Sequence, residues 1–198
     1  MVDASPGASA AASTPPVPAA STDVPFPPSD LTAFLQLCAG EWMSLRSLFG
    51  LGQLEEGANG DEWHSSERGE LVVTYLRAEH PAEPGGLLIA PKGHPERSLV
   101  FDRQGGFRAS AGASGTSASA AASGTSPAGH WQLWPDGSLE LRLESGGMEV
   151  RERIWFTKPN LRLRSTVEHR SDGSPGRASF SSEIRRVSRA AAPGATAA

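Results

Sequence analysis

The sequence predicts a mainly-β protein, an up-and-down antiparallel barrel or a sandwich, preceded by one short helix. Short alternating apolar segments recur from Trp42 to Val187, and Gly, Pro, Asn or Asp separates them. Helical periodicity is confined to a single segment before Gly40. Strands joined mainly by tight turns close into a barrel or stack as a sandwich. A barrel of about eight to ten strands has room for one small ligand.

Both ends of the chain are expected to lie outside the folded domain, which we place at residues 29–188. Residues 1–28 are rich in Ala, Ser, Pro and Thr, and residues 189–198 have a similar composition. Such segments bury too little apolar surface to offset the entropy lost on ordering. We therefore predict a disordered tail at each end.

The expected helix begins after Ser29 or Asp30, either of which can cap its first turn. Four apolar residues then recur at i, i+3, i+4 and i+7 on one face: Leu31, Phe34, Leu35 and Cys38. Gly40 is a natural stop. Because Cys38 lies on the apolar face, we expect a buried small side chain and not a nucleophile. It is the single cysteine of the chain, which excludes an internal disulfide and fits a reducing compartment.

Alternating segments after the helix give the expected strands. They are residues 41–49, 62–67, 71–76, 85–90, 98–101, a segment opening at Phe107, 130–134, 138–144, 148–156, 161–170 and 178–187. Arg68-Gly69 is expected to be a turn, and Pro135-Asp136-Gly137 has strong hairpin-turn chemistry. Residues 109–128 are low-complexity Ala, Ser and Gly. We interpret them as a disordered loop between two neighbouring strands.

Composition narrows the possible functions. The formal net charge is −4, so no general basic field is present to hold nucleic acid. No apolar run approaches the roughly 18 residues that cross a bilayer, and the start of the chain does not resemble a signal peptide. We expect a cytoplasmic protein with neither nucleic-acid nor membrane partners. The five histidines have no metal-like spacing, and common catalytic motifs are missing, so we expect no metal site.

The most informative stretch is residues 149–170, which contains the alternating run Leu-Arg-Leu-Arg. On a strand, Arg162, Arg164 and Thr166 share one face, while Leu161 and Leu163 share the other. Two neighbouring arginines repel each other unless they reach water, pair with acids across strands, or bind a charged anion. The residues alone leave a solvated outer face and an anion-binding face both open.

Residues 152–165 resemble the ER-x-WF-x-x-P-(D/N)-LRLR-S motif of the S/U-type phycobiliprotein chromophore lyases, the CpcS/CpeS family. Residues 34–46, FLQLCAGEWMSLR, are similar to the family's opening F-x-x-x-x-G-x-W-x-S-x-R. The Gly85-Gly86 segment and residues 178–185, ASFSSEIR, resemble two further family segments in matching order. The resemblance spans the region from about Leu31 to Val187.

The resemblance implies a lipocalin-like barrel that binds a linear tetrapyrrole, a bilin, and attaches it by a thioether to a cysteine of a phycobiliprotein subunit. It implies catalytic roles for Glu152 and Glu183, and ligand contacts for Arg46, Arg162, Arg164 and Thr166. We also expect Trp155 to contact the ligand by lining the cavity. The substrate would be phycocyanobilin or phycoerythrobilin, with no cofactor. The partners would be an apo-phycobiliprotein α or β subunit and, in addition, a second copy of the chain or a paralogous lyase subunit. A non-catalytic bilin carrier and a generic lipocalin-like binding protein are the alternatives.

Overall fold

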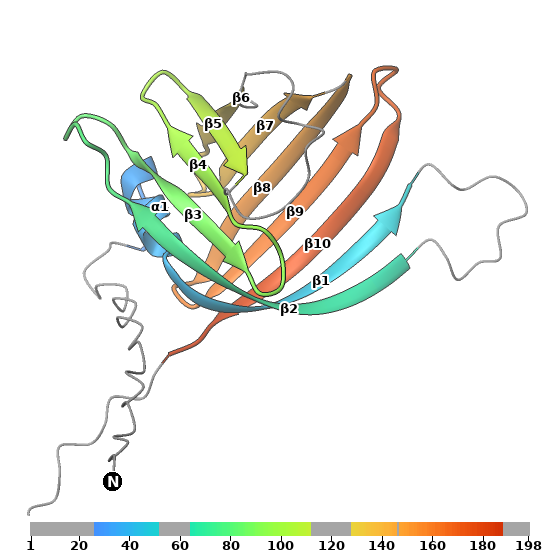
Figure 1. Ribbon diagram of the computed structural model, residues 1–198, viewed down its shortest axis with the longest axis horizontal. Helices are drawn as coiled ribbons and strands as arrows, with labels where there is room; N and C mark the ends of the chain where they lie inside the picture. The colour runs from blue at the N-terminus through green and yellow to red at the C-terminus, as the bar shows by residue number, and fades with distance from the viewer. Residues whose placement is uncertain (1–25, 52–63, 112–127, 146, 188–198) are drawn as a thin grey trace, which may run out of the picture.

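A computed structural model of the protein describes residues 26–51, 64–111, 128–145 and 147–187. In this part of the chain, helix α1 (Leu31–Cys38) is followed by ten strands. They are β1 (Gly40–Gly50), β2 (His64–Leu76), β3 (Gly85–Pro91), β4 (Arg97–Phe101), β5 (Gly106–Ala111), β6 (Ala128–Leu133), β7 (Leu139–Ser145), β8 (Met148–Lys158), β9 (Leu161–His169) and β10 (Pro175–Arg185). Each strand pairs antiparallel with the next along the chain, and β10 pairs back with β1, which closes the barrel (Figure 1). The predicted up-and-down barrel with one short helix is confirmed.

The expected tails fall outside the described residues, except for residues 26–28. Most of the Ala/Ser/Gly insert lies outside them too, but Ala109–Ala111 continue β5 and Ala128 opens β6. These two strands are neighbours in the barrel, with Gly106 opposite His130. The insert therefore connects two paired strands.

One strand prediction is wrong. Arg68-Gly69 is not a turn, because β2 runs through it as a single strand of 13 residues. Its register with β1 continues unbroken, with Ser44 opposite Gly69 and Leu45 opposite Arg68. Pairing with the long strand β1 overrides the local tendency of a glycine to end a strand.

Helix α1 begins and ends where the sequence indicates. The Asp30 side chain caps it by accepting a hydrogen bond from the Ala33 backbone nitrogen at 2.8 Å. The apolar face is buried, and both Phe34 and Cys38 have no exposed surface. Burial raises the pKa of the Cys38 thiol above its ordinary value, so the thiol stays protonated and unreactive, as expected of a structural cysteine.

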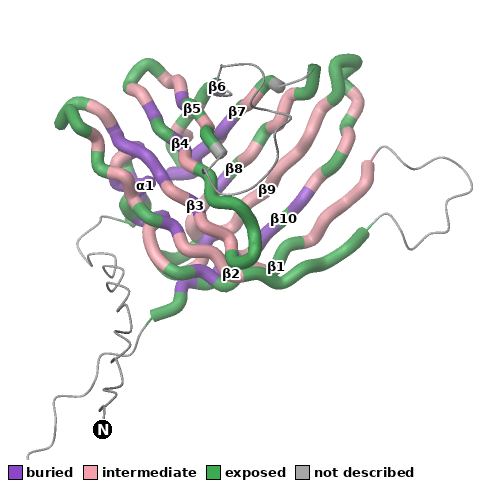
Figure 2. Tube along the Cα trace, viewed as in Figure 1, coloured by how far each residue is buried: buried purple, intermediate pink, exposed green. Residues whose placement is uncertain are grey.

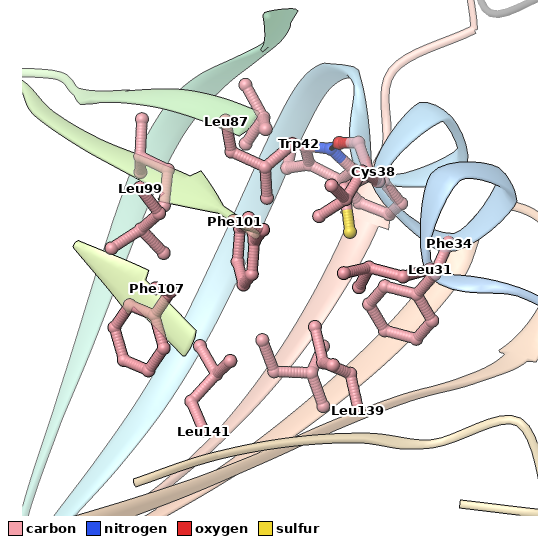
Figure 3. Packing of buried hydrophobic residues seen from close by; sticks show 14 residues of the cluster. Leu31, Phe34, Cys38, Trp42, Leu87, Leu99, Phe101, Phe107, Leu139 and Leu141 are labelled. Carbon is pink, nitrogen blue, oxygen red and sulfur yellow. Dashed lines mark hydrogen bonds between the residues drawn. The ribbon is translucent and has the colours of Figure 1, made fainter. Parts of the chain in front are cut away.

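The helix lies at the end of the barrel where β1 begins and β10 ends, which we call the closed end. Apolar side chains fill the barrel there (Figure 3). The buried cluster is Leu31, Phe34, Leu35, Cys38, Trp42, Val73, Leu87, Ile89, Leu99, Phe101, Phe107, Leu139, Leu141 and Ile154. Buried positions are concentrated near α1, while the hairpin turns are largely exposed (Figure 2). The opposite end, where β1 ends and β10 begins, is the mouth.

Arg185 ties the last strand to the end of the helix. Its guanidinium donates hydrogen bonds to the backbone carbonyls of Leu37 and Ala39, and to that of Pro159 at 3.3 Å. A cation at a helix C-terminus satisfies carbonyls that lack a partner within the helix. Within the described residues, no helix is long and apolar enough to cross a membrane.

Replacing Phe34 by Ala is expected to lower the free energy of unfolding by roughly 3–5 kcal/mol, because it removes a fully buried ring. The ring packs edge-on against Phe156, with centroids 5.4 Å apart. Urea unfolding measures the change, and Gln36→Ala on the exposed face of the same helix is the matched control. Equal stability of the two variants would show that the helix does not anchor the core.

Candidate functional site

Strand β9 turns its arginines into the barrel. Arg162 has 1% of its surface exposed, and 14% of the Arg164 side chain is exposed. Leu161 and Leu163, on the other face of the strand, are only partly buried. The reading in which both arginines face solvent is therefore wrong, and the strand reverses the usual distribution of polar and apolar side chains.

Arg162 is held by an acid and an aromatic ring. Its Nε donates to Glu183 Oε2 at 2.5 Å, and the two residues lie directly opposite each other on β9 and β10. The Arg162 guanidinium also lies over the Trp42 ring at 4.5 Å, and Arg185 lies over the same ring at 4.3 Å. The Trp42 indole nitrogen donates to the Cys38 carbonyl oxygen at 2.9 Å, which fixes the ring between its neighbours.

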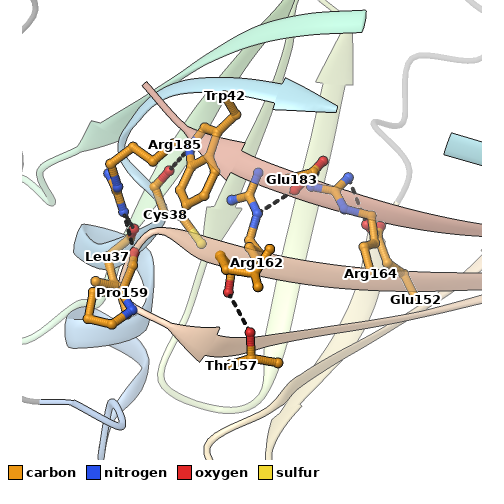
Figure 4. A network of polar contacts seen from close by, with 11 residues as sticks. Leu37, Cys38, Trp42, Glu152, Thr157, Pro159, Arg162, Arg164, Glu183 and Arg185 are labelled. Atoms are coloured by element: carbon orange, nitrogen blue, oxygen red, sulfur yellow. Dashed lines mark hydrogen bonds and ion pairs between the residues drawn. The ribbon is translucent and has the colours of Figure 1, made fainter. Parts of the chain in front are cut away.

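Arg164 links two carboxylates (Figure 4). Its Nη1 lies 2.9 Å from Glu152 Oε1, and its Nη2 lies 3.7 Å from Glu183 Oε1. Glu152 reaches the site from β8, and Glu183 reaches it from β10. Three adjacent strands thus bring two acids and two arginines together.

The charges of this cluster stabilise one another. Burial alone would raise the pKa of Glu183, but the charges of Arg164 and Arg162 outweigh it and hold that pKa below its ordinary value. Burial alone would lower the pKa of Arg164, but Glu152 and Glu183 raise it. Both residues therefore carry full charge at neutral pH, inside a barrel wall that largely excludes water.

Some buried polar atoms of the cluster have no hydrogen-bond partner among the described residues. Among the described residues, Arg162 Nη2 and Arg164 Nε have no hydrogen-bond partner although they are buried. Glu152 Oε1 makes an ion pair with Arg164 but lacks hydrogen-bond geometry. Buried polar atoms without partners are uncommon and costly in a folded protein, so these atoms are suited to a polar ligand.

Arg46 and Thr166 extend the polar surface towards the mouth. Arg46 Nη2 donates to Ser179 Oγ at 3.3 Å, and Arg46 Nη1 lies 3.5 Å from Glu67 Oε1. Thr166 lies opposite both Glu152 and Ser179 in the strand register. These two residues are more exposed than Arg162 and are open to a ligand that enters from the mouth.

Trp155 is not part of this interior. It is paired with Leu163 on the outward face of β9, and its ring lies 6.1 Å from that of Phe180, which is 41% exposed. The expected role of Trp155 in lining the cavity is therefore wrong. Side chains alternate along a strand, so its neighbours Ile154 and Phe156 point inward instead.

Sequence reasoning missed Arg97 on β4. It alternates with the buried Leu99 and Phe101, and so points into the barrel from the wall opposite β9. It lines the same interior space as Glu152 and Arg164. The spacing Arg-x-Leu-x-Phe could have indicated this, but we placed the start of the strand one residue later, at Ser98.

Little space is left deep inside the barrel. The cavity between Cys38, Arg97, Glu152, Arg162 and Arg164 has a volume of about 10 Å³. This is roughly the room that one water molecule needs. A ligand larger than a water molecule therefore does not fit into this cavity. The described residues contain no group of three or more His, Cys, Asp or Glu side chains that could hold a metal ion.

The fold and the site define a class of protein: a closed antiparallel barrel with an inward cluster of paired arginines and glutamates. Comparisons with known proteins give the family. The family model described as CpeS-like protein matches residues 118–186. The protein named chromophore lyase CpcS/CpeS 1 from Paulinella chromatophora is 40% identical over 165 residues, which cover 83% of this chain and 92% of that one.

Two further similarities agree. Chromophore lyase CpcS/CpeS 1 of Trichodesmium erythraeum is 31% identical over 176 residues, covering 78% of this chain and 96% of the relative. The solved structure of the S-type phycobiliprotein lyase CPES from Guillardia theta has a TM-score of 0.52 at 20% identity, covering 79% of this chain and 92% of that one. The structural similarity supports the fold. The chain belongs to the CpcS/CpeS chromophore lyase family.

Replacing Glu183 by Gln is expected to lower the free energy of unfolding by roughly 3–5 kcal/mol at pH 7, because Arg162 is left buried without its counter-charge. The lowered pKa of Glu183 means that its carboxylate stabilises the fold above its ordinary pKa of 4.5. This contribution is lost as the pH falls through the folded-state value. The difference between the variant and the wild type should therefore shrink in acid.

Urea unfolding at several pH values between neutral and strongly acidic measures this difference. The matched control is Glu41→Gln, an exposed glutamate on the neighbouring strand β1, which should change stability by less than about 0.5 kcal/mol. A Glu183→Gln effect that is the same at all pH values would contradict the role given to the ion pair.

Proposed function

We propose that this protein binds a linear tetrapyrrole in the mouth of its barrel and attaches it, as a chromophore lyase, to a cysteine of a phycobiliprotein subunit. The observation that carries the proposal is the inward cluster of Arg162, Arg164, Glu152 and Glu183 in a chain of the CpcS/CpeS family. A generic carrier of apolar ligands has no need of two buried arginines with unused donors.

The arginines suit the carboxylates of the pigment. A bilin carries two propionates, and a guanidinium binds a carboxylate through two parallel hydrogen bonds. Arg46 and Arg164 lie nearer the mouth and would contact the pigment directly. Arg162 is almost fully buried and already paired with Glu183, so its main role would be to orient that acid and keep it ionised. Thr166 would add a hydroxyl beside Glu152.

The acids suit the conjugated system of the pigment. A bilin gains a proton readily on its pyrrole nitrogens, and a nearby carboxylate stabilises the resulting cation. Glu152 reaches the mouth side of the cluster, and Glu183 lies behind it. The cationic pigment is more electrophilic at the exocyclic double-bond carbon of ring A, where the acceptor thiolate attacks.

The covalent step is an addition. The carbon–sulfur bond forms at the ring A substituent, the double bond accepts the electron pair of the thiolate, and a proton is returned to the ring. Nothing leaves and no oxidant or reductant is required. The protein would contribute by holding the pigment, orienting it and shielding it from addition at wrong positions.

We propose further that the pigment is phycocyanobilin or phycoerythrobilin and that no cofactor is used. The acceptor is an apo-phycobiliprotein α or β subunit in the cytoplasm. The protein would act as a homodimer or with a paralogous lyase subunit, and it would bind neither nucleic acid nor membrane.

The direct test is a transfer assay with phycocyanobilin and with phycoerythrobilin, each offered to separate apo-subunits. Covalent product is detected on a denaturing gel by zinc-enhanced fluorescence of the acceptor band. We expect a band for at least one subunit that depends on this protein. Pigment binding, seen as a change in visible absorbance, without transfer to any acceptor would contradict the lyase function and leave a carrier.

Replacing Glu152 by Gln is expected to slow transfer by at least roughly tenfold, because the protonated pigment loses its counter-charge. Absorbance of the bound pigment should shift towards that of the neutral form. Glu149→Gln is the matched control, since Glu149 lies on the same strand but faces outward and pairs with Arg151 at the surface. Equal transfer rates for the two variants would contradict the role of Glu152.

A further inference from the structure

Arg97 is an inward-facing charged side chain to which the proposed function assigns no role. It enters from β4, on the wall opposite the arginines of β9. In the register, Arg97 lies opposite Ile89 of β3, whose side chain belongs to the buried core. The alternation along β4 and the pairing with Ile89 on β3 both place the Arg97 side chain on the inner face of the barrel.

The other inward charges near it are already paired. Glu183 has Arg162 at 2.5 Å, Glu152 has Arg164 at 2.9 Å, and Glu67 has Arg46 at 3.5 Å. Arg97 forms no ion pair or hydrogen bond with any described residue. Among the described residues, Arg97 is therefore an inward-facing cation without a counter-ion.

The acids near Arg97 are already paired with other arginines. Burial is the main cause that lowers the pKa of Arg97; Arg164 and Arg46 also lower this pKa, while Glu152 and Glu183 raise it. Arg97 is at the same time exposed to solvent, although part of it borders the small cavity beside Glu152 and Arg164. An anion that binds here would relieve the repulsion among the three arginines and replace the water around them.

We propose that Arg97 is a second carboxylate anchor of the pigment, binding one propionate from β4 while Arg164 and Arg46 bind the other from β9 and β1. The inference rests on the proposed function. Anchors on opposite walls would hold the pigment across the mouth, above the filled interior. They would also favour ligands that carry two carboxylates over ligands that carry one.

Replacing Arg97 by Gln removes the charge and keeps a polar side chain of similar reach. Since Arg97 forms no ion pair or hydrogen bond with a described residue, the variant should fold normally, which circular dichroism and urea unfolding can verify. Arg97→Lys keeps the positive charge and should retain part of the affinity. Arg108→Gln is the matched control, because Arg108 lies on the adjacent strand β5, opposite Val100, and faces outward.

The experiment titrates each protein with phycocyanobilin and with its dimethyl ester, in which both propionates are neutral, and follows visible absorbance. We expect Arg97→Gln to bind the diacid roughly tenfold more weakly than the wild type. Its affinity for the ester should change by less than about twofold, because the contact is already absent there. Arg108→Gln should match the wild type with both ligands.

Wild-type affinity for the diacid in Arg97→Gln would overturn the inference, and so would an equal loss of affinity for diacid and ester. Both outcomes leave the proposed function standing, since the wild type still binds the pigment. A wild-type protein that binds neither form would instead overturn the proposed function and this inference with it.

Discussion

The buried ion pair between Arg162 and Glu183 is the interaction on which the rest of the site depends. It joins β9 to β10 inside the barrel, and the Arg162 guanidinium also covers Trp42 at the closed end. Taking both charges out of water is costly, and the pair repays this only while both partners are present. The pair fixes the arrangement of the neighbouring charges. It keeps Glu183 ionised beside Arg164, and Arg164 in turn pairs with Glu152. One buried pair therefore fixes the positions of the four side chains around which the pigment would bind.

The polarity of the barrel follows from the same constraint. Because the arginine side chains of β9 face inward, its leucine side chains face outward. They lie next to the outward side chains of the paired strand β10. Met43, Leu45, Phe180 and Ile184 on β1 and β10 are exposed on this outer face. The helix does not cover it, since α1 contacts β2 and β3. The interior is thus divided, with an apolar core that α1 closes and a charged surface towards the mouth. Stability comes mainly from the first part, and the proposed chemistry involves the second.

Much of the fold could be predicted from the sequence, because turn residues and alternation are local signals. The helix with its Asp30 cap and most strands could be predicted from these signals. The turn predicted at Arg68-Gly69 was wrong because the pairing of β2 with β1 is not a local signal. Alternation also showed that Arg162 and Arg164 share a face. It could not show which face points inward, since a leucine face is normally the buried one. Only closure of the barrel decides this. Trp155 was misplaced and Arg97 missed for a related reason: a shift of one residue moves a side chain to the other face.

We infer that the pigment binds in the mouth of the barrel, against the inward arginines of β9, and not on the apolar outer face. A crystal structure of the protein with phycocyanobilin tests this most directly. We expect pigment carboxylates within hydrogen-bonding distance of arginine side chains at the mouth, with Glu152 near the pyrrole nitrogens. Pigment stacked on the outer face over Trp155 and Phe180, with the interior cluster unchanged, would contradict it.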